Sequence, residues 1–166
     1  MNMKKVKTYN IMLSSVFMVT HPKAGQETEF APKVMAAVND TPCYLKKLHT
    51  IRANYELWKK RFEEVKRGEA VINLRQWTGR PYRSKTVLIK TLTSKDGIGI
   101  QKLEIVEERY KTRPLILCYV DGSQISDLLP TLAANDGLSV DDWLAWFAGY
   151  DHSKPLAIIH FTNFRY

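Results

Sequence analysis

The residues of this chain that could do chemistry together gather in one short stretch near the end of its first third. The stretch holds two lysines, a histidine, a threonine and an arginine, in the order Lys46-Lys47-Leu48-His49-Thr50-Ile51-Arg52. Amines, hydroxyls and guanidinium groups bind anions, act as nucleophiles or stabilise an oxyanion. The same composition is also typical of a solvated basic loop, and spacing alone does not separate the two interpretations.

An amphipathic helix is expected directly after this stretch, and it would hold the stretch in place. The helix is predicted to run from about Ala53 to Arg67 and to end at Gly68. Apolar side chains step by four and three residues, which is the spacing of one helix face, at Ile51, Tyr55, Trp58, Phe62 and Val65. We interpret this apolar face as core.

The rest of the chain predicts short strands, most of them joined as hairpins. Strands are expected at residues 9–19, 70–77, 84–92, 101–108, 113–120 and 156–164, and helices after Thr28, over 125–134 and from Ser139. Ser139 followed by Asp142 resembles a capping box. The pattern predicts an α+β fold with a small mixed or antiparallel β-barrel closed by helices.

Length and composition predict one globular domain over residues 1–166. The formal net charge of +8 favours polyanions or phosphorylated small molecules as partners. No apolar run is long enough for a membrane helix, and we read the segment from Ile11 to Val19 as a strand rather than a signal peptide. Cys43 and Cys118 are expected to be reduced thiols, Cys118 in the core, in a cytoplasmic monomer. The four histidines lack the spacing of a metal site, and no cofactor is expected.

With Lys47, Thr50 and Arg52 the chain resembles the ASCH domain family, a branch of the PUA-like β-barrel folds. The family pattern is a lysine, then Thr-x-Arg, then a helix, then Gly-Asp at the start of a strand. In this chain Gly68-Glu69 stands in the last place, with Glu instead of Asp.

The resemblance continues through the C-terminal half and covers roughly residues 45–166. Asp136-Gly137-Leu138-Ser139 leads into a helix, and a closing strand ends near Phe164. The first 40 or so residues would then be an N-terminal extension that packs on the domain.

The resemblance implies two kinds of activity. Small bacterial ASCH proteins hydrolyse the amide of N4-acetylcytidine with a Lys, a Thr and a Glu, and other members bind or cleave RNA. By position, the residues of an amidohydrolase would be Lys47, Thr50 and Asp136. Asp136 is a departure from the family, because its side chain is one methylene shorter than Glu.

Two assignments of these residues are chemically possible. In one, Lys47 is neutral and acts as the base while Asp136 holds it in place. In the other, Lys47 stays charged and stabilises the oxyanion while Asp136 activates water. In a flat strand Lys47 and Thr50 would point to opposite faces, so either assignment requires a bend at Leu48-His49.

The alternative function is a non-catalytic RNA-binding module on the hairpin at residues 70–92. Guanidinium groups bind phosphate and aromatic rings stack on bases. The hairpin carries Arg75, Trp77, Arg80, Tyr82, Arg83 and Lys85. Trp77 could instead pack in the core with the arginines as a solvated tip, or Trp77 and Tyr82 could line a nucleoside pocket.

Three further residues have simpler interpretations. His21 is expected at the surface, and His49 is expected to be structural rather than catalytic. Arg52 could bind a phosphate or carboxylate of the ligand, but an ion pair with Glu69 is the favoured interpretation.

Overall fold

The computed structural model describes residues 5–125 and 127–166, which form two β-sheets and four α-helices. One sheet has the order β1-β3-β4, with β1 (Lys7–Leu13), β3 (Ala70–Trp77) and β4 (Thr86–Leu92). The other has the order β2-β8-β5-β6-β7, with β2 (His49–Arg52), β8 (Leu156–His160), β5 (Gly99–Tyr110), β6 (Arg113–Val120) and β7 (Ser123–Gln124). The helices are α1 (Phe30–Val38), α2 (Tyr55–Lys66), α3 (Leu128–Asn135) and α4 (Val140–Phe147), with a short 3₁₀ turn, η1, at Ser94–Asp96.

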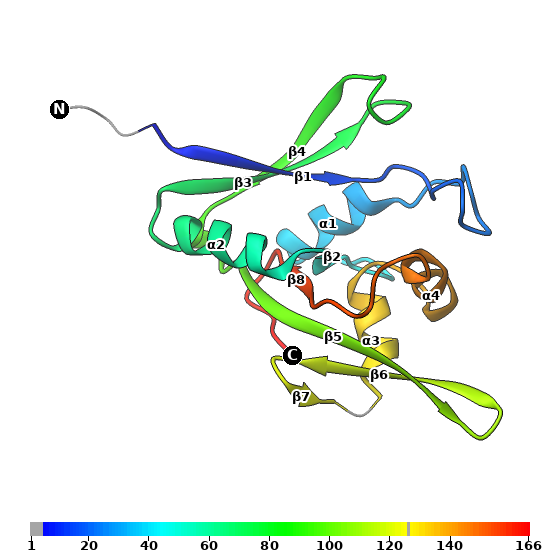
Figure 1. Cartoon of the computed structure of the whole chain (residues 1–166). Helices are drawn as coiled ribbons and strands as arrows, with labels where there is room; N and C mark the ends of the chain where they lie inside the picture. Colours follow the sequence, from blue (N-terminus) through cyan, green and yellow to red (C-terminus); the bar gives the residue numbers. More distant parts are fainter. Residues whose placement is uncertain (1–4, 126) are drawn as a thin grey trace.

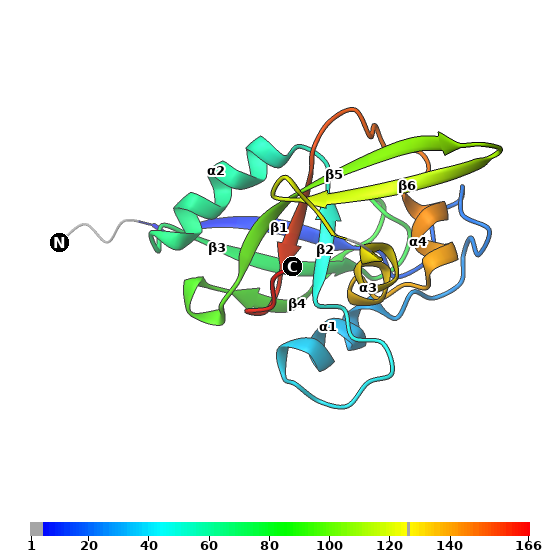
Figure 2. The ribbon, with the colours of Figure 1, turned by 90° about the horizontal axis from the view of Figure 1, so that it is seen from below.

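The α+β class predicted from the sequence is confirmed, but the closed barrel is wrong. Among the described residues neither sheet closes on itself. The chain leaves β4 through η1 and enters β5 in the other sheet, so the two hairpins do not pair with each other. Figure 1 shows the three-stranded sheet above and the long β5–β6 hairpin below, and in Figure 2 strands β1 and β3 run across β2 and β8.

The N-terminal segment is built into the core rather than placed on its surface. Strand β1 pairs in parallel with β3 along its whole length, from Lys7 opposite Ala70 to Leu13 opposite Gln76. Ile11 and Leu13 are buried, and so are Phe30 and Val34 of α1. The strand predicted over 9–19 ends at Leu13. Residues 1–4 lie outside the described part of the chain.

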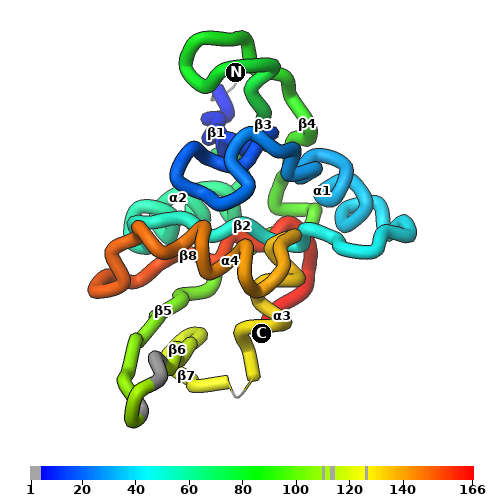
Figure 3. Tube along the Cα trace, turned by 90° about the vertical axis from the view of Figure 1, so that its right-hand side faces the viewer, coloured from blue at the N-terminus to red at the C-terminus, as the bar shows by residue number. Residues whose placement is uncertain are grey.

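Helix α2 is the best-predicted helix. It spans Tyr55–Lys66, close to the expected range, and Asn54 caps it by accepting a hydrogen bond from Leu57 N at 3.2 Å. Trp58, Phe62 and Val65 are buried, which confirms the predicted core face. Helices α1 and α2 lie on opposite sides of the short strand β2 (Figure 3).

The other local predictions hold with shifted ends. Both hairpins form, and β3 and β6 have the predicted bounds. The hydroxyl of Ser139 accepts a hydrogen bond from Asp142 N at 3.1 Å and starts α4. Pro130 does not interrupt α3, because it lies in the first turn, where a helix needs no backbone N–H donor. Across the described residues, every helix is too short or too polar to cross a membrane.

Candidate functional site

Lys47 and Asp136 form a buried pair where two loops meet. Lys47 lies just before β2 and Asp136 just after α3, and the two residues form an isolated antiparallel β-bridge. Lys47 Nζ lies 2.5 Å from Asp136 Oδ1 and 2.7 Å from the Asp136 carbonyl oxygen. Both side chains are 2–3% exposed. The bridge brings the two main chains so close that the short Asp136 side chain reaches the amine.

Gly137 permits this close approach. It has a φ of +78°, and a Cβ there would lie 3.3 Å from Lys47 Cβ and 3.4 Å from Lys33 Cδ. Lys33 donates to the Gly137 carbonyl at 2.9 Å and to the Thr28 carbonyl at 3.0 Å. Helix α1 therefore holds the loop that carries Asp136.

The pair borders a small cavity of about 30 Å³ that also takes in Thr50 and Arg52. Lys47 precedes the start of β2 at His49, so the strand alternation does not separate it from Thr50. Lys47 and Thr50 therefore border the same cavity, as the hypothesis requires. Thr50 is buried, and within residues 5–125 and 127–166 its hydroxyl has no hydrogen-bond partner.

Arg52 is an incompletely paired cation at the same cavity. Its Nη2 donates to the carbonyl of Met12, while its Nε is buried without a hydrogen-bond partner. The expected ion pair with Glu69 is wrong, because Glu69 accepts from Arg67 Nη2 at 2.9 Å. Burial lowers the pKa of Arg52, against the opposing effect of the nearby Tyr150 and Asp136.

Burial and pairing oppose each other in the Lys47–Asp136 contact. Burial lowers the pKa of Lys47 and raises the pKa of Asp136, while each partner favours the charged form of the other. The charge of Arg52 and the indole of Trp143 also act to lower the pKa of Asp136. The ammonium of Lys47 has three good contacts, two to Asp136 and one to the ring of Phe30, whose centroid lies 4.1 Å away. This geometry suits a charged lysine.

A second layer of polar groups lies behind the pair. His49 Nε2 is 2.7 Å from the hydroxyl of Tyr166, which also accepts from Asn135 Nδ2 at 3.1 Å. Burial holds the pKa of His49 well below its usual range, so His49 is neutral. Its Nδ1 has no hydrogen-bond partner and lies 3.9 Å from Asp136 Oδ1. His49 therefore links the start of β2 to the C-terminal Tyr166.

Apolar and aromatic side chains form much of the cavity wall. They come from Leu13 at the end of β1, Phe30 of α1, and Trp146, Phe147 and Tyr150 at and after the end of α4. A volume of about 30 Å³ has room for a water molecule but not for a nucleoside, because ligand pockets measure roughly 300–1,000 Å³. Tyr150 also lines a neighbouring pocket of about 490 Å³, with Asn54, Tyr55 and Asp151 among its other residues. Tyr150 therefore lies between the reactive groups and a ligand-sized space.

The hairpin residues proposed for ligand binding do not line this cavity. Arg75 Nε donates to the hydroxyl of Thr86 at 2.9 Å, so part of its guanidinium is already hydrogen-bonded within the hairpin. Trp77 is half-buried, outside the hydrophobic core, and packs against Tyr82 with ring centroids 5.3 Å apart and ring planes tilted by 52°. Tyr82 is 91% exposed and Arg83 is exposed. Tyr82 is near enough to Arg52 to influence its pKa.

The surface prediction for His21 is wrong. His21 is buried, packs on Phe17 with ring centroids 4.5 Å apart, and places Nε2 3.1 Å from the Asp142 carbonyl oxygen. The aromatic side chains of the loop and of α4 enclose it, which no local spacing indicated. Both cysteines are free; Cys118 is buried as predicted, and burial raises its pKa to about 11.

Four further residues belong to this site although no sequence motif predicts them: Tyr150, Phe30, Asn135 and Tyr166. They reach it from elements far apart in the chain, and none belongs to a motif with Lys47. In the part of the chain that the structure describes, no group of three or more His, Cys, Asp or Glu side chains could hold a metal ion. Comparison with models of protein families, with curated proteins and with solved structures finds no match to this chain.

Proposed function

We propose that this chain is an ASCH-type protein that hydrolyses an amide on a modified nucleoside such as N4-acetylcytidine. The observation that carries the proposal is the single cavity shared by Lys47, Thr50, Arg52 and Asp136. The ASCH resemblance of three of these residues and the position of Asp136 support the same reading. Two cations and one carboxylate leave this cavity with one excess positive charge, which suits a developing oxyanion.

In the proposed reaction Asp136 takes a proton from a water molecule, and the water oxygen attacks the acyl carbon. The carbonyl oxygen becomes an oxyanion that Lys47 and Arg52 stabilise as cations. The unpartnered hydroxyl of Thr50 orients the water. The C–N bond then breaks, Asp136 returns the proton to the amine nitrogen, and the products are cytidine and acetate.

Substrate must reach the cavity past its aromatic wall. The pocket of about 490 Å³ on the other side of Tyr150 is large enough for a nucleoside. We place the nucleoside there, with only the acyl group passing Tyr150 to reach Lys47 and Asp136. Movement of a cover before chemistry is common in enzymes that exclude water from the reaction.

The test is hydrolysis of N4-acetylcytidine, followed by chromatography of cytidine, for wild type and the Lys47→Met and Asp136→Asn variants. Wild-type turnover should fall by at least about a hundredfold in both variants, as for a lost catalytic group. Lys46→Met is the matched control, because it removes the lysine next to Lys47 in the chain, whose amine pairs with Asp40 outside the cavity. Folding of each variant is checked by circular dichroism. No wild-type turnover above the uncatalysed rate would sink the proposal.

RNA binding by the β3–β4 hairpin is the second candidate function. The observation in its favour is Tyr82, which is 91% exposed, packs against Trp77 and has the exposed Arg80 and Arg83 nearby in the chain. Binding of a short single-stranded RNA should then weaken steeply as salt rises, since phosphate contacts release counterions. A Tyr82→Ala variant should weaken binding at every salt concentration. Equal binding by Tyr82→Ala and wild type would exclude this platform.

A further inference from the structure

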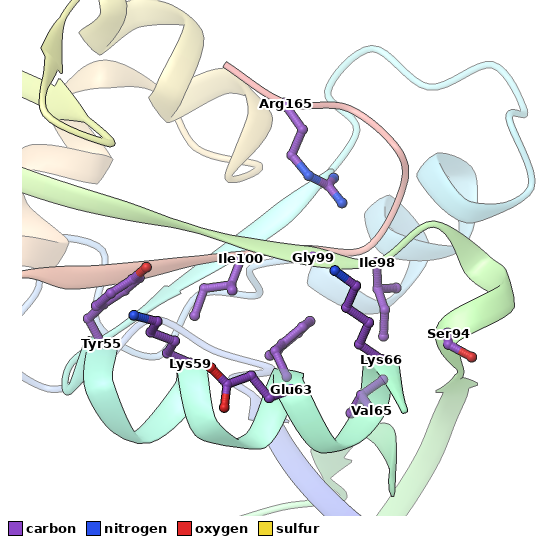
Figure 4. Close-up of a pocket in the computed structure, with 11 residues that line it drawn as sticks. Tyr55, Lys59, Glu63, Val65, Lys66, Ser94, Ile98, Gly99, Ile100 and Arg165 are labelled. Atoms are coloured by element: carbon purple, nitrogen blue, oxygen red, sulfur yellow. The ribbon is translucent and has the colours of Figure 1, made fainter. Parts of the chain in front are cut away.

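A second pocket, of about 530 Å³, lies between α2 and the start of β5, and its lining shares no residue with the Lys47 cavity (Figure 4). Its apolar lining comes from Phe62 and Val65 of α2 and from Ile98 and Ile100 of the β5 segment. Tyr55 stands at one end, where α2 begins. The volume falls in the range of small-molecule pockets, and the apolar lining can hold the body of a ligand.

Three cations border this pocket. Lys59 and Lys66 rise from α2, and Arg165 comes from the C-terminal segment and lies beside Gly99, across β5 from α2 (Figure 4). Across residues 5–125 and 127–166, none of these three cations forms an ion pair with a carboxylate. The pocket lining contains one carboxylate, Glu63. The lining thus carries a net charge of +2, from three cations and one anion.

Arg165 is held in a fixed orientation by main-chain groups alone. Its Nη1 donates to the carbonyls of Thr162 at 2.8 Å and Phe164 at 2.6 Å, and its Nη2 donates to the carbonyl of Gly97 at 2.8 Å. Gly99 makes room for it, because a Cβ at Gly99 would overlap Arg165 Nη2. Carbonyl bonds orient the guanidinium without cancelling its charge, so the charge remains for a ligand.

We propose that this pocket binds a small phosphate monoester with an aromatic body. A phosphate monoester carries a charge between about −1.5 and −2 at neutral pH, which matches the +2 of the lining. The phosphate would lie by Lys59 and Lys66 near Gly99, where the absence of a side chain leaves the charge of Arg165 close to the pocket. The aromatic body would lie over Phe62 and Ile100 beside Tyr55. A lone inorganic phosphate would leave the apolar lining in water, so the body contributes to affinity.

The test is calorimetric titration of the full chain with phenyl phosphate, phenol and inorganic phosphate as three separate probes. Phenyl phosphate should bind more tightly than either fragment. Lys59→Gln and Lys66→Gln should each weaken its binding by about two- to fivefold, as for exposed charge pairs. Glu63→Gln should strengthen it, because it removes the only opposing charge of the lining. Lys60→Gln is the matched control, since Lys60 is an exposed lysine of α2 outside the pocket.

A second measurement locates the ligand. Methyl resonances of Ile98 and Ile100 should shift on addition of phenyl phosphate, while those of Leu13 at the other cavity should not. The proposal is overturned by equal binding of inorganic phosphate and phenyl phosphate, by equal effects of Lys66→Gln and Lys60→Gln, or by absence of binding. None of these results bears on hydrolysis at Lys47, so the two proposals fail independently.

Discussion

At the scale of single residues, two buried histidines, His49 and His160, make the free energy of unfolding depend on pH. His160 Nε2 lies 3.0 Å from Gln101 Oε1, and that oxygen must accept because Gln101 Nε2 donates to Asp121. His160 therefore carries its proton on Nε2, and its Nδ1 is buried without a partner. Burial lowers the pKa of His160 to about 3, and the pKa of His49 shifts in the same direction. Both histidines are neutral in the folded protein at neutral pH.

The free energy of unfolding should consequently fall as pH drops from about 6.5 toward 3. In this window the unfolded chain binds protons that the folded chain excludes, so stability rises with pH and is lost on acidification. Each such histidine contributes a slope of up to about 1.4 kcal/mol per pH unit. Urea unfolding at pH 5 and pH 7 measures the free energy of unfolding at both pH values, and the difference gives the slope. His160→Gln should reduce the slope, and an unchanged slope in this variant would contradict the assignment.

Replacing Arg52 should lower activity strongly and change the free energy of unfolding only slightly. Its Nε is buried without a partner, and replacing an incompletely paired buried charge by an apolar group of similar volume is often neutral or stabilising. Arg52→Met should therefore change the free energy of unfolding by less than about 1 kcal/mol, or raise it. Under the proposed function it should lower kcat/KM by at least about tenfold. A large loss of stability in urea would show that the Met12 contact is the main role of Arg52.

At the scale of elements, the end of α4 decides whether the cavity is open. Trp146, Phe147 and Tyr150 line it, and Tyr150 packs on Phe147 with ring centroids 4.7 Å apart. Only the last of these three side chains also lines the pocket of about 490 Å³. Movement of one ring would join the two spaces, with no change in the sheets.

Access can be measured without any assumption about chemistry, through a thiol placed at the cavity. In a Thr50→Cys, Cys43→Ser chain, Tyr150→Ala should raise the rate of labelling by a small thiol reagent by about tenfold or more. Tyr150→Phe, which keeps the ring, should leave the rate unchanged. Cys118 is buried and reports general unfolding. Equal labelling of the introduced thiol in the Tyr150→Ala and Tyr150→Phe variants would show that Tyr150 does not control access.

At the scale of the whole molecule, both sheets and all four helices of the described chain contribute to one hydrophobic core. Residues 5–40 supply β1 and α1, whose buried side chains include Ile11, Leu13, Phe30 and Val34. They also supply the Met12 carbonyl that binds Arg52 and the Phe30 ring over Lys47. Residues 41–166 therefore do not enclose the core or the Lys47 cavity without residues 5–40.

A chain of residues 41–166 should accordingly fail to unfold cooperatively in urea, whereas the full chain should show one transition. Each large apolar side chain removed from a core costs about 2–5 kcal/mol, and this truncation removes several against a typical total of about 5–15 kcal/mol. A milder test is Ile11→Ala in the full chain, which should lower the free energy of unfolding by about 2–5 kcal/mol. A cooperative transition of the truncated chain at the full-length midpoint would refute the prediction.

Prediction from sequence succeeded where the signal is local. The apolar face of α2, the Ser139 cap of α4 and the two hairpins each depend on residues within a few positions of one another. It failed for His21 and for the barrel, because burial and sheet closure depend on which distant elements meet. For the site, the sequence selected Lys47, Thr50 and Asp136 through a resemblance, without showing that they meet.

The amino-acid sequence by itself determined the helices, the hairpins, the basic charge and the set of reactive side chains. The tertiary structure alone decided that β1 pairs with β3, that Lys47 contacts Asp136 across 89 residues of chain, and that Tyr150 lines their cavity. The physical reason is the range of the interactions. Helix and turn preferences arise from neighbours in the chain, whereas pairing, burial and cavity shape arise only when the whole core packs.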